Sequence, residues 1–226
     1  MAKTKWATVK SLENLGNDVH RIYCSSDEPL NHAAGNYVIL RSTIPNSEKP
    51  EDVLKRAYSI SSRPNHEDPL AFHFTIIDVG AMSAWLSNQS EGARLEFSGP
   101  WGKKFRALPE DHQECIHLFA TGTGFSPIGA MALNRLHHGT STVHVWWQTD
   151  FPYDRIALEQ LAENPRFQVH QGPAVASEVP AQKDALYFFA GDGAVIQPLC
   201  LRLLEEGVAA ESLRTEYFFN KPPRKR

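Results

Sequence analysis

The spacing of apolar residues divides the chain into two parts with different patterns. In the first part, short segments with alternating apolar and polar residues are separated by turn-forming residues, which predicts strands with one buried face. These strands are expected at residues 6–12, 19–25, 37–42, 57–61, 70–77 and 94–98. One brief helix is expected at 83–88, and the proline-containing segment 43–55 is expected to be a surface loop. The pattern predicts a six-stranded antiparallel β-barrel.

In the second part, strands and helices alternate. The run 115–120 is continuously apolar, as expected for a strand that is buried on both faces. Further strands are expected at 142–148, 167–171, 186–190 and 215–219, and helices at 127–137, 155–163 and 197–206. Ser126 is suited to cap the first helix, Pro127 to begin it, and Gly207 to close the last. This alternation predicts a parallel α/β sheet, so we expect two domains, 1–108 and 109–226.

Two glycine-rich turns follow strands of the second part. Thr121, Gly122, Thr123 and Gly124 lead from a strand into a helix, where free backbone N–H groups favour a phosphate. Gly191 and Asp192 follow a later strand of the same sheet. Ligands of open α/β sheets bind beyond the carboxyl ends of the strands, so the two turns predict one nucleotide crevice. The alternative is that both are tight connections without a ligand.

The segment from Arg56 to Ser62 has the chemistry of a second nucleotide site. Tyr58 can stack on a flat heterocycle, Ser59 can offer a hydroxyl to its edge, and Arg56 can hold a phosphate. The turn Gly80, Ala81, Met82 and Ser83 opens the short helix and could bind the same phosphate with Arg56 as countercharge, or it could be an ordinary helix start.

Composition excludes several other classes. A net charge of −3 and a pI near 6.4 argue against a nucleic-acid surface. No apolar run approaches the roughly 20 residues that cross a bilayer, and the first residues lack the apolar core of a signal peptide, so we expect a cytoplasmic protein without membrane insertion. Three scattered cysteines cannot hold a four-cysteine iron–sulfur cluster, and the ten histidines show no metal-binding spacing. No metal site is expected.

These motifs, taken in their order, resemble the ferredoxin–NADP reductase family of flavoproteins. The resemblance extends over nearly the whole chain and rests on six segments: Arg56-Ala57-Tyr58-Ser59, Gly80-Ala81-Met82-Ser83, Gly99-Pro100-Trp101-Gly102, Thr121-Gly122-Thr123-Gly124 with Pro127, Ala190-Gly191-Asp192-Gly193, and Glu216-Tyr217-Phe218. It implies a flavin-binding barrel followed by a nicotinamide-binding domain.

The resemblance also implies roles for residues. Tyr58 would stack on the flavin, Ser59 would bond near its reactive nitrogen, and Glu216 would lie near the nicotinamide and help a proton reach the flavin. The flavin phosphates would be held by Arg56 and by the four residues from Gly80 to Ser83. The pyridine nucleotide would be received by Thr121 to Gly124 with Pro127 and by Gly191-Asp192. Ala190 stands where many members have a cysteine, which indicates tuning of the reaction.

The implied activity is hydride transfer from NAD(P)H to a flavin that passes single electrons to a separate acceptor, such as a ferredoxin, a flavodoxin or an oxygenase component. FAD is expected, with FMN as the alternative. Asp150 and the absence of arginine from 172–178 favour NADH, although Arg155, Arg166 or the basic tail could reverse this preference. Two rival functions are a reductase of free flavin or ferric chelates and a redox-silent module that senses flavin or nucleotide.

Overall fold

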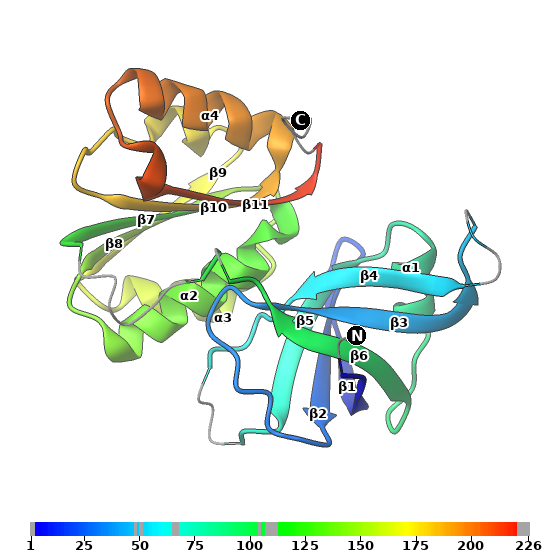
Figure 1. Cartoon of the computed structure of the whole chain (residues 1–226). Coiled ribbons are helices and arrows are strands. Elements are labelled where there is room, and N and C mark those ends of the chain that lie inside the picture. Colours follow the sequence, from blue (N-terminus) through cyan, green and yellow to red (C-terminus); the bar gives the residue numbers. More distant parts are fainter. Residues whose placement is uncertain are drawn as a thin grey trace. The chain divides into compact units, whose positions relative to one another are not determined.

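The chain folds into two compact units, which a computed structural model assigns to Met1–Lys103 and Lys104–Arg226 (Figure 1). The structure describes residues 3–47, 49, 52–64, 68–103, 105–106 and 113–220. The expected domain boundary, between residues 108 and 109, lies outside the described residues. Each unit is described by itself below.

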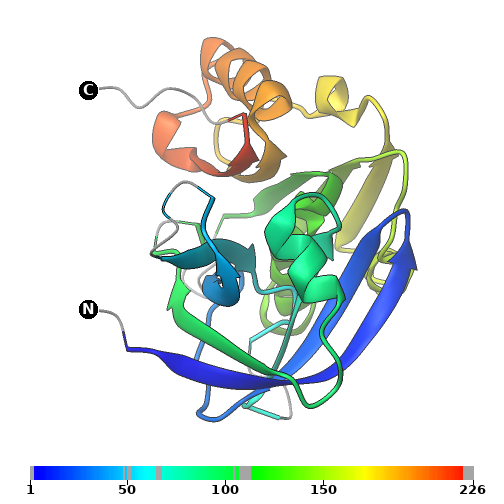
Figure 2. The same cartoon turned by 90° about the vertical axis from the view of Figure 1, so that its right-hand side faces the viewer.

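The first unit is a six-stranded antiparallel sheet with one short helix. Its strands are β1 (Lys5–Gly16), β2 (Val19–Ser26), β3 (Tyr37–Pro45), β4 (Val53–Ser59), β5 (Ala71–Ile77) and β6 (Arg94–Trp101), and its helix is α1 (Ala81–Ser87). The strand order is β4-β3-β6-β1-β2-β5, so β4 and β5 are the two edges. Figure 2 shows how strongly the strands of this sheet curl.

Contacts just beyond β4 join the two edges of this sheet. Ile60 forms a bridge with Phe74 of β5, and the backbone N–H of Ser61 donates to the carbonyl oxygen of His73 at 2.8 Å. The Ser61 and Thr75 hydroxyls lie 3.2 Å apart. The sheet therefore closes into the predicted barrel, whose core contains three phenylalanines, Phe72, Phe74 and Phe97.

The second unit is a five-stranded parallel sheet with helices on both faces. Its strands are β7 (Cys115–Thr121), β8 (Thr142–Gln148), β9 (Phe167–Gly172), β10 (Leu186–Asp192) and β11 (Leu213–Phe219). The helices are α2 (Phe125–His138), α3 (Arg155–Ala162) and α4 (Gly193–Glu205), with 3-10 turns η1 (Gly122–Gly124), η2 (Val175–Glu178) and η3 (Ala210–Ser212). In Figure 1, α4 covers one face of this sheet, and α2 and α3 cover the other.

The order of the parallel strands is β11-β10-β7-β8-β9. The chain starts in the middle with β7, moves outward through β8 and β9, and then returns to β10 on the other side of β7. The strand order thus reverses between β7 and β10, which is where open α/β sheets bind ligands. Both glycine-rich turns, after Thr121 and after Ala190, lie at this reversal, as predicted.

Adjacent tryptophans of β8 bury their rings on opposite faces of the parallel sheet. Trp146 packs on the α4 side, with Tyr187 and Phe189 in the same core cluster. Trp147 stacks on Phe125 of α2, with ring centroids 3.9 Å apart. This alternation, one ring in the α4-side core and one under α2, is what the sequence predicts for a strand.

Three sequence expectations about element ends are wrong. β3 continues to Pro45 and β4 begins at Val53, so the segment 43–55 is the end of a strand pair rather than one long loop. Helix α2 begins at Phe125 with Gly124 at its N-cap, and Ser126 forms no capping bond because it already lies within the first turn. Helix α4 begins at Gly193, four residues before the expected start, because Asp192 caps it through the Ala194 N–H.

None of the helices in the described residues is long and apolar enough to cross a membrane.

Candidate functional site

A cavity of about 510 Å³ lies beside β4 and the start of α1 in the first unit. It is lined by Pro45, Ser47, Leu54, Arg56, Ala57, Tyr58, Val79, Gly80, Ala81, Met82 and Ser83. Seven of the eight residues predicted to contact a flavin are in this lining, and Ser59 is the eighth. Two segments more than twenty residues apart in the chain are thus brought together at one cavity of small-molecule size.

The cavity side of β4 is selected by strand periodicity. Leu54, Arg56 and Tyr58 are spaced two residues apart, so their side chains point to the same face of the strand. Leu54 is buried in the core, whereas Arg56 is exposed. The guanidinium of Arg56 donates to the Lys55 carbonyl oxygen at 2.8 Å. Arg56 is the one charged side chain among the described lining residues, which gives the cavity a positive potential suited to an anion.

The Tyr58 side chain is held by contacts with two other elements of the unit, β5 and α1. It packs against Phe74 with ring centroids 5.4 Å apart, and Ser83 of α1 interacts with its hydroxyl. Burial raises the pKa of Tyr58, while the interactions with Ser83 and Arg56 act in the opposite direction. The phenol is therefore neutral near pH 7 and presents an uncharged aromatic surface to the cavity.

Gly80 allows the backbone to turn into α1 beside this cavity. Its φ is +95°, which side-chain-bearing residues rarely adopt, and a Cβ atom placed there would meet nothing within 4 Å. The glycine is thus required by the turn and not by crowding from the protein. A ligand can approach the backbone closely at this point.

A second cavity, of about 220 Å³, lies at the reversal of strand order in the second unit. It is lined by Thr121, Gly122, Gln148, Thr149, Asp150, Pro173, Asp192, Val195 and Phe219. Of the residues predicted for the pyridine nucleotide, Thr121, Gly122 and Asp192 are in the lining. Thr123, Gly124, Pro127 and Gly191 are not.

Gly122 leaves room at this cavity, and its position is fixed by aromatic side chains. It has a φ of +48°, and an added Cβ would meet nothing within 4 Å. Its carbonyl oxygen accepts from the Trp147 indole N–H at 2.9 Å. Because Trp147 also stacks on Phe125, the turn between β7 and α2 is tied to both elements.

Gly124 and Gly191 serve close packing instead. An added Cβ at Gly124 would lie 2.1 Å from the Ala190 carbonyl oxygen, and one at Gly191 would lie 2.2 Å from Thr121 Oγ1. These glycines let β7, η1 and β10 approach each other at the strand reversal. The same approach brings the Asp192 N–H within 2.7 Å of Thr121 Oγ1, to which it donates.

The two helices that begin at this edge differ in how their first N–H groups are satisfied. At α4, the Asp192 carboxylate accepts from the Ala194 N–H at 2.8 Å and from Asn220 Nδ2 at 2.8 Å. At η1 and α2 no side chain caps the helix, and no acidic residue lies in the first turn. The positive end of α2 is therefore the end that a phosphate can occupy.

Glu216 lies in β11 at the same edge of the sheet. It pairs in register with Ala190, one residue before Gly191. Its side chain is half-buried. The predicted proton-transfer residue is thus next to the second glycine turn.

The charges around the second cavity are negative. Asp150 and Asp192 are in the lining, and no lysine or arginine is among the described lining residues. Arg166 directly precedes β9, so it lies at the amino edge of the sheet, opposite the cavity. Its guanidinium donates to the carbonyl oxygens of Leu136 and Ser141. Of the cations that could have countered Asp150, Arg166 is therefore excluded, Arg155 is exposed at the start of α3, and the tail 221–226 lies outside the described residues.

Sequence reasoning missed part of both linings. Pro45, Ser47 and Val79 flank the first cavity, and Pro173, Val195 and Phe219 flank the second. None of them belongs to a recognisable motif. In the described residues, no group of three or more histidine, cysteine or acidic side chains is arranged to hold a metal ion.

Comparison with known proteins agrees with this geometry. Residues 7–105 match the family model of the oxidoreductase FAD-binding domain. The chain is 25% identical to the ferredoxin–NAD(P)+ reductase CarAd of Metapseudomonas resinovorans, over 94% of this chain and 68% of that protein. It is 34% identical to ferredoxin–NADP reductase B of Sorangium cellulosum, over 57% of this chain and 52% of that protein.

The fold also matches a solved structure over its full length. A ferredoxin–NADP+ reductase from Neisseria gonorrhoeae, with bound FAD and NADP, superposes with a TM-score of 0.78 at 16% identity, covering 97% of this chain and all of that one. The family model, the relatives and the fold together support membership of the ferredoxin–NADP reductase family. The predicted family and its two-part fold are confirmed.

Proposed function

We propose that this chain is an FAD-dependent oxidoreductase that takes hydride from NAD(P)H and delivers electrons one at a time to a separate acceptor. The observation that carries the proposal is the assembly of Arg56, Tyr58 and the turn from Gly80 to Ser83 around one positively charged cavity. Bound FAD would supply the step from a two-electron donor to a one-electron acceptor. Ferredoxin, flavodoxin or an oxygenase component is the proposed acceptor, since the related reductases are named for ferredoxin.

In the first unit, each residue has a role that its position supports. Arg56 and the backbone from Gly80 to Ser83 would hold the flavin phosphates, because a guanidinium and free N–H groups both favour an anion. The neutral ring of Tyr58 would stack on the flavin ring system. Ser59, the next residue of β4, would offer its hydroxyl near the reactive nitrogen.

In the second unit, the nucleotide would bind across the strand reversal. Its pyrophosphate would meet the uncapped N–H groups at Gly122, Thr123 and Gly124, since at α4 the Asp192 carboxylate already accepts from the Ala194 N–H and would repel an anion. Gly191 and Pro127 would shape this edge by packing, and Glu216 would hand on a proton. The stacked geometry needed for hydride transfer then depends mainly on orientation.

We further propose that NADH is preferred over NADPH. Asp150 lies in the cavity wall at the end of β8, where a carboxylate can accept from a ribose hydroxyl but would repel a 2′-phosphate. The segment after β9, which contains Pro173 and the 3-10 turn η2, has no arginine between residues 172 and 178 that could pair with a 2′-phosphate. The Ala176 N–H of that turn donates to Gln148 Oε1 at 3.3 Å, which fixes the wall.

The test is an anaerobic titration of the purified chain, loaded with FAD, with NADH and NADPH. We expect either nucleotide to bleach the flavin absorbance, NADH at the lower concentration, and a ferredoxin to restore it. Restoration by free flavin or a ferric chelate, but by no protein acceptor, would replace the proposed acceptor. Binding of both ligands without bleaching would show a redox-silent module, and failure to bind FAD would refute the proposal altogether.

A further inference from the structure

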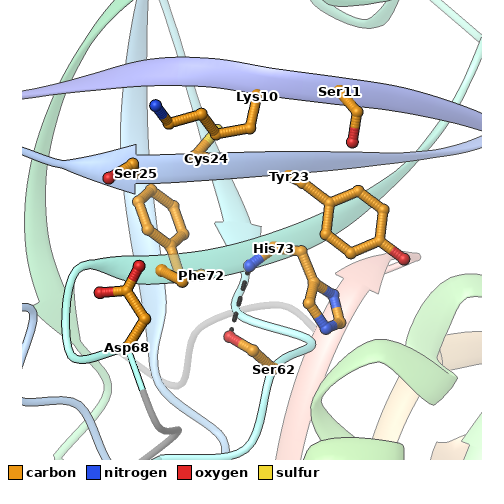
Figure 3. Close-up of a pocket in the computed structure, with 10 residues that line it drawn as sticks. Lys10, Ser11, Tyr23, Cys24, Ser25, Ser62, Asp68, Phe72 and His73 are labelled. Atoms are coloured by element: carbon orange, nitrogen blue, oxygen red, sulfur yellow. Dashed lines mark hydrogen bonds between the residues drawn. The ribbon is translucent and has the colours of Figure 1, made fainter.

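A third cavity, of about 410 Å³, lies on the barrel and shares no lining residue with the first (Figure 3). It is formed by β1, β2, β5 and the segment that leads into β5. Its lining consists of Lys10, Ser11, Tyr23, Cys24, Ser25, Ser62, Asp68, Ala71, Phe72 and His73. The volume is in the range of small-molecule sites. None of the roles proposed above uses this cavity.

A β-bulge places Lys10 at this cavity. Val9 pairs with Cys24 and Ser11 pairs with Tyr23, so Lys10 is an extra residue in β1 with no counterpart in β2. A bulge bends its strand and changes the direction of the side chain. Lys10 is exposed, and it contributes to the cavity wall beside Ser11.

Two aromatic rings form one end of the cavity. Tyr23 and His73 lie with ring centroids 5.1 Å apart at a tilt of 50°. The Tyr23 hydroxyl donates to Glu13 at 2.9 Å, which holds the Tyr23 ring, and the backbone N–H of His73 donates to Ser62 Oγ at 3.3 Å. A planar group can pack against these two rings.

The other end carries two opposite charges that are not paired. Lys10 and Asp68 are the charged groups among the described lining residues, and neither forms an ion pair with another described residue. Several other charged residues of this unit are paired, for example Lys3 with Glu28 at 2.7 Å. One Asp68 oxygen accepts from the Leu70 N–H at 2.9 Å, which fixes the carboxylate. Figure 3 shows Lys10 and Asp68 toward the end away from Tyr23 and His73.

We propose that this cavity binds a free amino acid with an aromatic side chain. Lys10 would hold the ligand carboxylate, Asp68 would hold its ammonium, and Tyr23 and His73 would pack against its ring. Two unpaired opposite charges match a zwitterion, since a simple acid would face Asp68 and a simple amine would face Lys10 without compensation. The aromatic end gives the apolar contact that a zwitterion alone lacks.

The test is isothermal titration calorimetry of the full chain, loaded with FAD, against four probes. L-Phenylalanine should bind saturably with a Kd of about 1 mM or tighter. 3-Phenylpropionate, phenethylamine and glycine lack the ammonium, the carboxylate and the ring respectively, and each should bind at least about tenfold more weakly. No saturable binding of L-phenylalanine, or equal binding of any of the three partial probes, would overturn the proposal.

Two substitutions then locate the site. Lys10→Ala and Asp68→Ala should each weaken L-phenylalanine binding by about tenfold or more, the loss expected for one charge-assisted hydrogen bond. Lys183→Ala removes an exposed lysine of the other unit and should leave binding unchanged. If neither Lys10→Ala nor Asp68→Ala changes the Kd, the ligand binds elsewhere and the assignment fails.

Discussion

The two proposed cofactor cavities are built in opposite ways. In the barrel, side chains of one strand carry the chemistry: Arg56 supplies charge and Tyr58 supplies an aromatic surface. In the parallel sheet, the backbone at the strand ends supplies the binding groups, and the charged side chains in the lining are two carboxylates, Asp150 and Asp192. The first cavity therefore selects an anion through its side chains, whereas the second must hold its anion through N–H groups while its carboxylates favour hydroxyl partners.

The glycines show a second contrast, between positions that leave room for a ligand and positions that serve packing. Gly80 and Gly122 have positive φ values and open space where a side chain would be, so they leave room for a ligand. Gly124 and Gly191 have backbone or hydroxyl atoms within 2.3 Å of that position, so they serve the fold. The single glycine-rich turn from Thr121 to Gly124 thus contains one glycine that leaves room for a ligand, Gly122, and one that is required by packing, Gly124.

The largest effect is expected from Gly124→Ala. The new Cβ would overlap the Ala190 backbone, so β10 or η1 must shift, and overpacking of this kind costs about 1–3 kcal/mol or more. Urea unfolding should show the lost free energy of unfolding. Gly122→Ala is the matched control, since it meets only the left-handed backbone cost of about 1–2 kcal/mol. Equal stability of the Gly124 variant and the wild type would contradict the packing role.

Arg56→Ala should weaken FAD binding by about 1.5–3 kcal/mol, the range for a hydrogen bond to a charged group. The FAD dissociation constant of the apoprotein measures this loss. Lys55→Ala is the control, because it removes the neighbouring positive charge, which pairs with Asp52 at 2.9 Å. An unchanged dissociation constant in the Arg56 variant would remove the assigned phosphate role.

Acid should destabilise the second unit through His117. This side chain is fully buried between Tyr187 and His144, with both ring centroids 4.7 Å away, and its Nδ1 accepts from the Trp146 indole N–H. Burial lowers the pKa of His117 to about 4. The unfolded chain binds more protons between this value and the ordinary pKa near 6.5, so the free energy of unfolding should fall as pH decreases through that interval.

Urea unfolding at several pH values measures this slope. His117→Gln keeps a side-chain acceptor for Trp146 but cannot titrate, so its free energy of unfolding should depend less on pH between 6.5 and 4. The same slope in both proteins would assign the acid sensitivity to other groups.

The smallest effect concerns nucleotide choice. Asp150→Ser removes the repulsive carboxylate, so the ratio of kcat/KM for NADH to that for NADPH should fall by about tenfold, or about 1.4 kcal/mol. Asp184→Ala, an exposed carboxylate outside the cavity lining, is the control. A wild type that prefers NADPH by tenfold or more would contradict the proposed role of Asp150.

Local patterns were sufficient for much of the fold. Strand alternation and the continuous run before Thr121 predicted both sheets. The resemblance assigned Arg56 and Gly80 to one flavin-phosphate site; the two residues line the same cavity, and their role stays a prediction. Element ends were less predictable. Ser126 and Pro127 have the composition of a helix start, but the tight approach of Gly124 to Ala190 moves that start back to Phe125, and no local pattern reveals a long-range packing distance.

The missed cavity residues have a similar cause. Phe219 lines the second cavity because β11 ends beside β10, and Val195 lines it because α4 begins directly after β10; the place of β10 next to β7 depends on the order of the strands in the sheet. Pro45 and Ser47 line the first because β3 extends further than its alternation indicates. The assigned roles of the individual site residues stay predictions.

The most direct test of two separate cofactor sites is a paired measurement on Gly80→Val and Gly122→Val. Both glycines have positive φ and open surroundings, so the two substitutions carry similar backbone cost and differ in which cavity the new side chain enters. We predict that Gly80→Val weakens FAD binding with little change in the KM for NAD(P)H once FAD is saturating. Gly122→Val should instead raise that KM by about tenfold or more, with FAD content intact. Loss of FAD from the Gly122 variant, with FAD retained by the Gly80 variant, would contradict the account by reversing the two sites.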